Sequence, residues 1–89
     1  MTGETPWSVG FESRAEKDLA RLDPQVARRV IDALDRLVAL DPSLDLRRLQ
    51  GSDEWRIRVG DWRIRLQLDF TARTVIVVRI LPRGRAYER

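Results

Sequence analysis

The stretch that decides the fold is WRIRVGDWRIRLQL (residues 55–68), in which apolar and polar residues alternate on both sides of Gly60-Asp61. Such alternation predicts two β-strands that each bury one face. Glycine at the first central position suits a two-residue type II′ turn, so the two strands are expected to form a hairpin. The register that follows places three apolar pairs on one side of the sheet: Val59 with Trp62, Ile57 with Ile64, and Trp55 with Leu66.

The other side of this hairpin carries two facing pairs of guanidiniums, Arg58 with Arg63 and Arg56 with Arg65. Like charges directly opposite one another destabilise strand pairing by about 0.2 to 1 kcal/mol each. A bound anion would turn this repulsion into attraction, and guanidinium forks suit phosphate because they donate two parallel hydrogen bonds. Alternatively, the arginines splay apart in solvent or pair with acids such as Glu54 and Glu88.

The elements before the hairpin are predicted from period and capping signals. Residues 7–11 alternate as a short strand with one buried face. Ser13 and Glu16 match a capping box, which predicts a helix from Ser13 that stops near Leu22. Asp23 followed by proline is a second helix start.

An apolar stripe from Ala27 to Val38 continues this second helix until Asp41-Pro42 interrupts it. Two antiparallel helices joined by a tight turn are therefore expected. Residues 74–81, rich in Val and Ile, add a third strand to the meander, and Pro82 ends it. The predicted fold class is α+β, an antiparallel sheet in β-α-α-β-β-β order packed on an N-terminal helical hairpin.

The composition of the 89-residue chain restricts its chemistry. This length suits a single domain over residues 1–89. The chain has no Cys and no His, which excludes thiolate nucleophiles, disulfides, Cys/His zinc sites and a histidine base. Sixteen of the 17 basic residues are Arg, and residues 47–89 carry a net charge of +6 against −3 for residues 1–46. This asymmetry indicates a phosphate-containing partner, although coding bias in the source genome is an alternative reason for the arginine content.

Residues 1–6 lack the basic start and apolar stretch of a signal peptide, and no apolar run approaches the length of a membrane span. We therefore expect a cytoplasmic protein that does not associate with membranes.

The element order and four local motifs resemble the RelE/ParE superfamily of bacterial toxins. The motifs are AEKDLARLDPQV, LRRLQG, WRIRVGDWRIRL and RGRAY, and the resemblance extends from about Trp7 to Tyr87. It implies a RelE-like fold, consistent with the predicted elements. RelE-type members cut mRNA in the ribosomal A site, whereas ParE-type members inhibit DNA gyrase.

The resemblance implies a set of catalytic residues of the RelE type. Their pattern has two basic residues on the first hairpin strand, one at the start of the next, and Arg followed four positions later by Tyr. The matching residues are Arg56, Arg58, Arg63, Arg83 and Tyr87. This match favours a ribosome-dependent endoribonuclease, an mRNA interferase that inhibits translation.

The first two of these positions hold arginine where the best-known active pattern has lysine. Arginine stabilises developing charge on a phosphorane. It stays protonated at physiological pH, so it serves proton abstraction badly. The general base is left open among Tyr87, Glu54, Asp61, Glu88 and a ribosomal group.

Several other arginines, the tryptophans and the helix acids allow either a functional or a purely structural interpretation. Arg47, Arg48, Arg65 and Arg85 are candidates for RNA contacts, although the first two could simply flank a buried leucine pair. The three tryptophans are expected in the core rather than stacked on bases. The acids Asp18, Asp32 and Asp35 are expected on a solvated helix face, with Asp32 and Arg36 at the spacing of a surface ion pair.

The resemblance further implies a cognate antitoxin that masks the basic face, a toxin–antitoxin hetero-oligomer, and the ribosome with its mRNA and rRNA as partners. No metal and no organic cofactor is implied. Two alternatives remain: a ParE-like gyrase inhibitor without nuclease activity, and an inactive toxin-fold binding protein.

Overall fold

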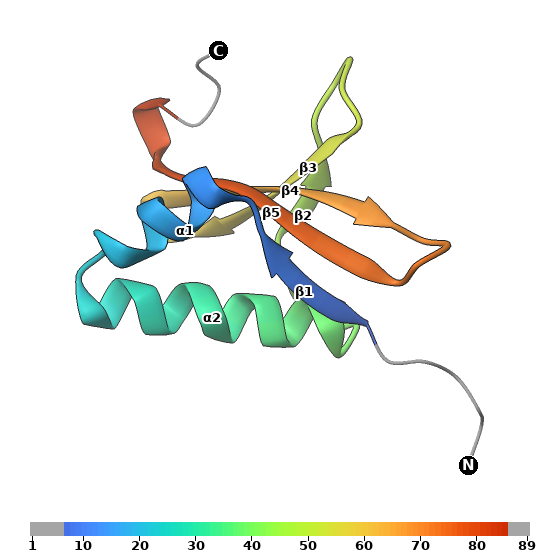
Figure 1. The fold of residues 1–89 in the computed structure, drawn as a ribbon, viewed down its shortest axis with the longest axis horizontal. Helices are drawn as coiled ribbons and strands as arrows, with labels where there is room; N and C mark the ends of the chain where they lie inside the picture. The colour runs from blue at the N-terminus through green and yellow to red at the C-terminus, as the bar shows by residue number, and fades with distance from the viewer. Residues whose placement is uncertain (1–6, 86–89) are drawn as a thin grey trace.

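A five-stranded sheet with two helices makes up the computed structural model, which describes residues 7–85 (Figure 1). The strand order is β1-β5-β4-β3-β2, with β1 parallel to β5 and the other pairs antiparallel. The predicted α+β class is therefore confirmed. The elements are β1 (Ser8–Phe11), α1 (Ser13–Ala20), α2 (Pro24–Val38), β2 (Leu46–Arg48), β3 (Glu54–Val59), β4 (Trp62–Asp69), β5 (Thr74–Pro82) and the 3₁₀ helix η1 (Arg83–Arg85).

The predicted β3–β4 hairpin is confirmed in every pair. Val59 lies opposite Trp62, and the pairing continues in register through Glu54 and Gln67. Gly60 in the turn has a φ of 57°, the left-handed region that a type II′ turn requires at its first central position. The turn residue therefore sets the face on which each side chain of the hairpin lies.

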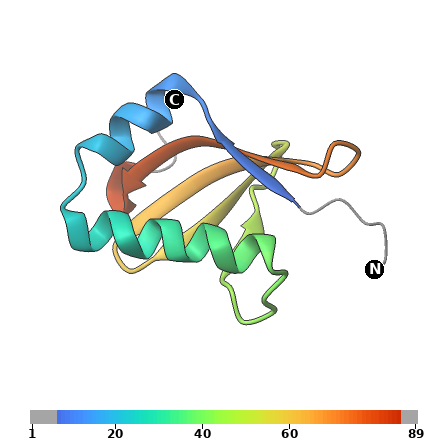
Figure 2. The ribbon, with the colours of Figure 1, turned by 60° about the horizontal axis from the view of Figure 1, so that its bottom comes forward.

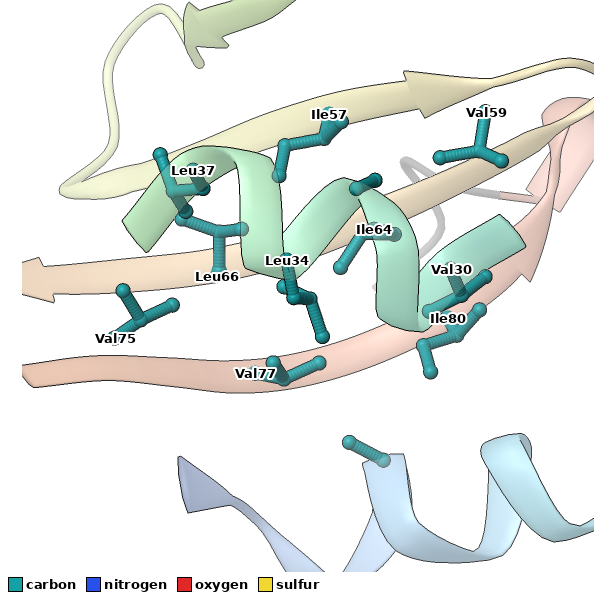
Figure 3. Packing of buried hydrophobic residues seen from close by; sticks show 12 residues of the cluster. Val30, Leu34, Leu37, Ile57, Val59, Ile64, Leu66, Val75, Val77 and Ile80 are labelled. Atoms are coloured by element: carbon teal, nitrogen blue, oxygen red, sulfur yellow. The ribbon is translucent and has the colours of Figure 1, made fainter. Parts of the chain in front are cut away.

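The core lies between one face of the sheet and α2, as Figure 3 shows. Val30, Leu34 and Leu37 recur at helical spacing on α2 and are all buried. Ile57 and Ile64 oppose them from the sheet and are fully buried, which is worth about 1.5 to 3 kcal/mol for each side chain. The tryptophans pack against this core as expected.

A register shift between Arg65 and Leu66 explains the irregular apolar pattern of β5. Leu66 pairs with Val77, whereas Arg65 pairs with Arg79, so one additional residue of β5 is accommodated between the two pairs. The side-chain alternation is thereby reset, and both Val77 and Ile80 are buried in the core. The same shift places Arg79 on the arginine side of the sheet.

The helix α1 covers the edge of β5 beyond the point where β1 stops. The strand β1 ends at Phe11, which pairs with Val77, and Figure 2 shows α1 continuing beside the sheet. Asp18 of α1 accepts the backbone N–H of Ile80 at 2.9 Å and the Nε of Arg79 at 2.8 Å. The prediction that Asp18 lies on a solvated face is therefore wrong, because its side chain is only 11% exposed and ties α1 to β5.

The structure also tests the predicted helix starts and shows one additional strand. The capping box is wrong: the N-cap of α1 is Glu12, with no side-chain capping bond, and Ser13 is the first helical residue. The second helix starts as predicted, with Asp23 accepting the N–H of Gln25 at 2.9 Å. The strand β2 was not predicted, because three residues are too few to show a period.

The C-terminal end of α2 contains a strained residue. Leu40 has a φ of 58° and is 72% exposed, directly after the helix. The N–H of Asp41 bonds to the carbonyl of Arg36 at 3.0 Å, as in a Schellman motif, where glycine normally takes the left-handed position. A side chain with a Cβ pays a steric cost there.

We predict that Leu40→Gly raises the free energy of unfolding by about 1 kcal/mol, because glycine adopts this conformation without the steric cost. Urea denaturation measures the change. Leu40→Ala is the matched control, since it removes the apolar side chain but keeps the Cβ. Equal stability of the two variants would show that the backbone of Leu40 is unstrained.

The carboxyl group of Asp18 makes the stability of the fold depend on pH. Burial raises the pKa of Asp18, but hydrogen bonds from Arg79 and Ile80 and the charges of Arg79 and Arg14 outweigh this, so the pKa lies below its usual value. A lowered folded-state pKa stabilises the fold above the unfolded-state value of about 3.9, and this stability is lost as the pH falls through the folded-state pKa.

We therefore expect Asp18→Asn to be less stable at pH 7 by about 2 kcal/mol and to lose less stability than the wild type below about pH 4. Urea denaturation at several pH values tests this, with the exposed Asp35→Asn as control. Parallel pH curves for the wild type and Asp18→Asn would contradict the prediction.

Candidate functional site

The face of the sheet opposite α2 carries a row of arginines across four adjacent strands. Each member is the register partner of the next, from β2 through β3 and β4 to β5. The row consists of Arg47, Arg56, Arg65 and Arg79. The facing of the two central members is predicted by the sequence, whereas the outer two depend on the pairing of β2 and on the register shift in β5.

Carboxylates from outside the row neutralise its members. Glu54 bonds Arg65, with its Oε1 2.6 Å from Nη2 and 2.7 Å from Nε. Asp18 binds Arg79, and its hydrogen bond raises the pKa of that guanidinium further. The alternative that the hairpin arginines pair with acids is thus confirmed for Arg65, which pairs with Glu54. Glu88 lies outside the described residues.

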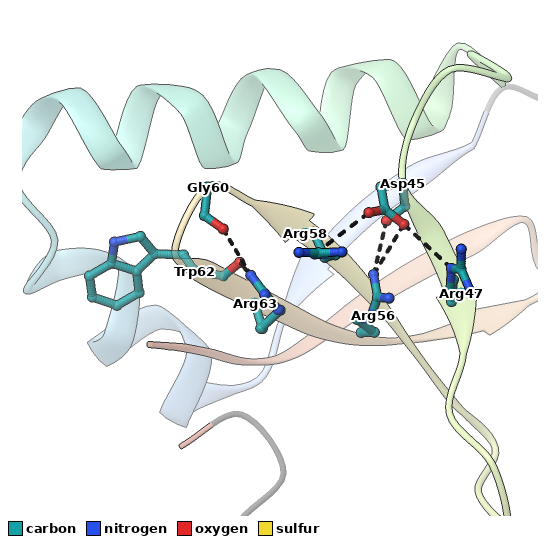
Figure 4. A network of polar contacts seen from close by, with 7 residues as sticks. All are labelled: Asp45, Arg47, Arg56, Arg58, Gly60, Trp62 and Arg63. Atoms are coloured by element: carbon teal, nitrogen blue, oxygen red, sulfur yellow. Dashed lines mark hydrogen bonds and ion pairs between the residues drawn. The ribbon is translucent and has the colours of Figure 1, made fainter. Parts of the chain in front are cut away.

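Asp45 is the acid that sequence reasoning missed. It lies in the loop before β2, and its carboxylate is within ion-pair distance of three guanidiniums, as Figure 4 shows. Its Oδ1 is 3.2 Å from Nη1 of Arg56 and 3.7 Å from Nε of Arg47. Its Oδ2 is 3.7 Å from Nε of Arg58. One negative charge therefore compensates three positive ones, which leaves the surface near Asp45 basic.

Exposure separates the arginines that are free to meet a ligand from those that support the fold. The side chain of Arg58 is 50% exposed, against 12% for Arg56. Arg63 is buried, and its Nη1 donates to the carbonyl oxygens of Gly60 and Trp62, both at 2.9 Å (Figure 4). Arg63 thus holds the hairpin turn in shape.

The C-terminal end of the described chain approaches the same turn. The N–H of Arg83 donates to the carbonyl oxygen of Asp61 at 2.7 Å, which fixes η1 beside the hairpin. Arg83 is exposed there. The backbone of Arg85 lies in η1, and Tyr87 lies outside the described residues. The sheet face that carries the row of Arg47, Arg56, Arg65 and Arg79 is called the arginine face below. The structure therefore brings Arg58, Arg63 and Arg83 to one end of this face.

The neighbours Arg47 and Arg48 are separated by the strand they form. Arg47 pairs with Arg56 and joins the arginine face, with a side chain 75% exposed. Arg48 alternates to the opposite face, where it lies 3.8 Å from the carboxylate of Asp53. The two residues thus do not form one RNA-contacting pair on this sheet.

Among residues 7–85, no cluster of three or more acidic side chains has the arrangement needed to hold a metal ion. Neither helix in this range is long and apolar enough to cross a bilayer.

Comparison with known proteins assigns the chain to a family. Residues 9–87 match the family described as the ParE toxin of the type II toxin–antitoxin system, parDE. The chain therefore belongs to the ParE toxin family, within the RelE/ParE superfamily of toxins.

Relatives in sequence and structure carry RelE names. A protein of Methanocaldococcus jannaschii that bears the name toxin RelE1 is 30% identical over 86 residues, covering 92% of this chain and 96% of its own. The archaeal RelE–RelB complex of Pyrococcus horikoshii has a chain that is 25% identical with a TM-score of 0.76, covering 92% and 100%. The RelB–RelE complex of Methanococcus jannaschii has one that is 26% identical with a TM-score of 0.72, covering 88% and 94%.

We predict that Asp45→Ala lowers the free energy of unfolding by about 1 to 2 kcal/mol, because Arg56 loses a charge-assisted partner and three guanidiniums repel one another. Urea denaturation at low salt measures the effect, which should shrink at 1 M salt as the repulsion is screened. The control is Asp53→Ala, which removes the same charge from a side chain that is 98% exposed. The two variants should differ, since exposed pairs contribute little.

Proposed function

We propose that this toxin is a ribosome-dependent endoribonuclease that cleaves mRNA in the ribosomal A site and so inhibits translation. The observation that carries the proposal is the position of Arg58 and Arg83, two exposed arginines beside the hairpin turn on a face with excess positive charge. The RelE names of its relatives support the same reading.

The proposed chemistry is electrostatic. Arg58 and Arg83 would donate charged hydrogen bonds to the scissile phosphate, where negative charge grows as the 2′-oxygen attacks. Arg56 would add a further guanidinium from beside Arg58, and Arg63 would position the turn that carries them. The ribosome would supply much of the remaining catalysis by holding the mRNA in an orientation suited to in-line attack.

The proton acceptor is not an arginine, because guanidinium stays protonated at physiological pH. Glu54 is engaged by Arg65 at 2.6 Å and its side chain is only 16% exposed, which makes it a poor base. Asp61 is exposed at the turn, next to Arg83. We propose Asp61, Tyr87, Glu88 or a ribosomal group for this role, with Tyr87 also a candidate for orienting the 2′-hydroxyl.

A cognate antitoxin is part of the proposal. The type II toxin–antitoxin family and the RelE–RelB complexes among the structural relatives support a protein partner that covers the basic face. Such a complex would act in the cytoplasm, where the ribosomes are.

The ParE family match favours a second candidate, inhibition of DNA gyrase. In that case the exposed arginines would contact acidic groups of a protein rather than RNA. Two parallel assays separate the candidates: mapping of mRNA ends on ribosomes with a defined A-site codon, and gyrase supercoiling.

We predict that Arg58→Ala and Arg83→Ala each lower the rate of A-site cleavage by about 10²- to 10³-fold, as expected for removal of a donor to the transition state. Arg21→Ala is the control, since it removes one exposed positive charge just after α1. Cleavage that survives both site substitutions would disprove the assignment. Gyrase inhibition without cleavage would favour the second candidate.

A further inference from the structure

A second basic region lies behind the arginine face, between α2 and the β3–β4 turn. It is a cleft of about 530 Å³ with walls from the helix, from the loop after it and from the end of β3. Its charged lining residues are four arginines and two aspartates: Arg28, Arg29, Arg36, Arg58, Asp32 and Asp45. None of its arginines on α2 is used by the proposed cleavage chemistry.

The cleft exists because β2 is short. Its first residue, Leu46, pairs with Ile57, so no strand covers β3 beyond that point. The N–H of Arg58 donates to the carbonyl oxygen of Asp45 at 3.2 Å. Beyond Arg58, the edge of β3 is open toward α2.

Arg29 reaches from α2 to the hairpin turn. A Cβ added at Gly60 would lie 2.8 Å from Nη2 of Arg29, so the guanidinium rests directly on the turn. Gly60 therefore serves two purposes, since it supplies the positive φ and leaves room for this side chain.

The cleft contains positive charge that the protein itself does not neutralise. Arg36 is engaged by Asp41 and Ser43, at 2.9 and 2.7 Å. The hydroxyl and N–H of Ser43, together with Arg36, lower the pKa of Asp41 to about 2, so this carboxylate stays ionised. Arg36 thus pairs with Asp41 and not with Asp32, contrary to the expected surface pair.

Arg28 and Arg29 differ from Arg36. Within residues 7–85, neither takes part in an ion pair or a side-chain hydrogen bond, and both are exposed. Asp32, four and three residues further along α2, does not reach either guanidinium as a salt bridge. Both guanidiniums line the cleft and have no acceptor among these residues, so they can donate to a ligand.

We propose that this cleft binds backbone phosphates of single-stranded RNA, as an extension of the path over the arginine face. The inference rests on the proposed function, which supplies RNA as the ligand. Arg58 belongs to both the arginine face and the cleft. An RNA strand that leaves the arginine face at Arg58 would therefore cross the open edge of β3 and reach Arg28 and Arg29. Guanidinium forks match phosphate geometry, and single-stranded RNA is flexible enough to follow this bend.

The test is binding of a fluorescein-labelled single-stranded RNA 12-mer, measured by anisotropy at several salt concentrations without ribosomes. Loss of two phosphate contacts in Arg28→Gln/Arg29→Gln should weaken binding about tenfold at 0.1 M salt and make the salt slope shallower by about 1.4 units. Lys17→Gln/Arg21→Gln is the matched control, because it removes the same charge from exposed positions at α1. Unfolding curves for both double variants verify that they fold.

Equal weakening in the two double variants would overturn the proposal, as would a wild type that does not bind the RNA. The proposal would also be overturned if Arg28→Gln/Arg29→Gln weakened binding of an RNA hairpin duplex but not of the single-stranded 12-mer, since the site would then recognise structured RNA. So would weaker binding of an acidic peptide with unchanged RNA binding. Because the assay uses free RNA, absence of ribosomal cleavage would count against the proposed function and leave the result for the cleft intact.

Discussion

The pairing of β3 with β4 through the Gly60 turn is the constraint on which the structure depends. Because strand side chains alternate, this one register sends Ile57 and Ile64 into the core and their neighbours Arg56 and Arg58 to the opposite face. A shift by one residue would bury guanidiniums and expose the core. The core and the basic face are therefore two consequences of the same hydrogen-bond ladder.

A row of arginines across four strands can persist only because acids reach it from elsewhere in the chain. The three acids come from a loop, a strand end and a helix: Asp45 contacts Arg47 and Arg56, Glu54 binds Arg65, and Asp18 binds Arg79. This compensation stabilises the sheet without cancelling its charge. Arg58 remains half exposed beside the shared carboxylate of Asp45, so its guanidinium is accessible to an anionic ligand.

Most of the fold could be predicted because its signals are local and periodic. The hairpin register, the second helix start at Asp23 and the α+β class all follow from residues close in sequence. The failures have physical reasons. Ser13 is not the N-cap because α1 begins one residue after β1 ends, so Glu12 occupies the N-cap position and Ser13 is already helical. The strand β2 is too short to show a period and is formed only by pairing with β3.

The sequence by itself determined which residues form the hairpin and that its arginines face one another, because alternation and the Gly60 turn are encoded within 14 consecutive residues. Only the tertiary structure decided what each arginine does. Arg63 is buried against the turn, Arg58 is exposed, and Arg29 lies over Gly60 in the wall of a cleft. These outcomes depend on contacts between segments distant in the chain, which sequence periodicity does not record.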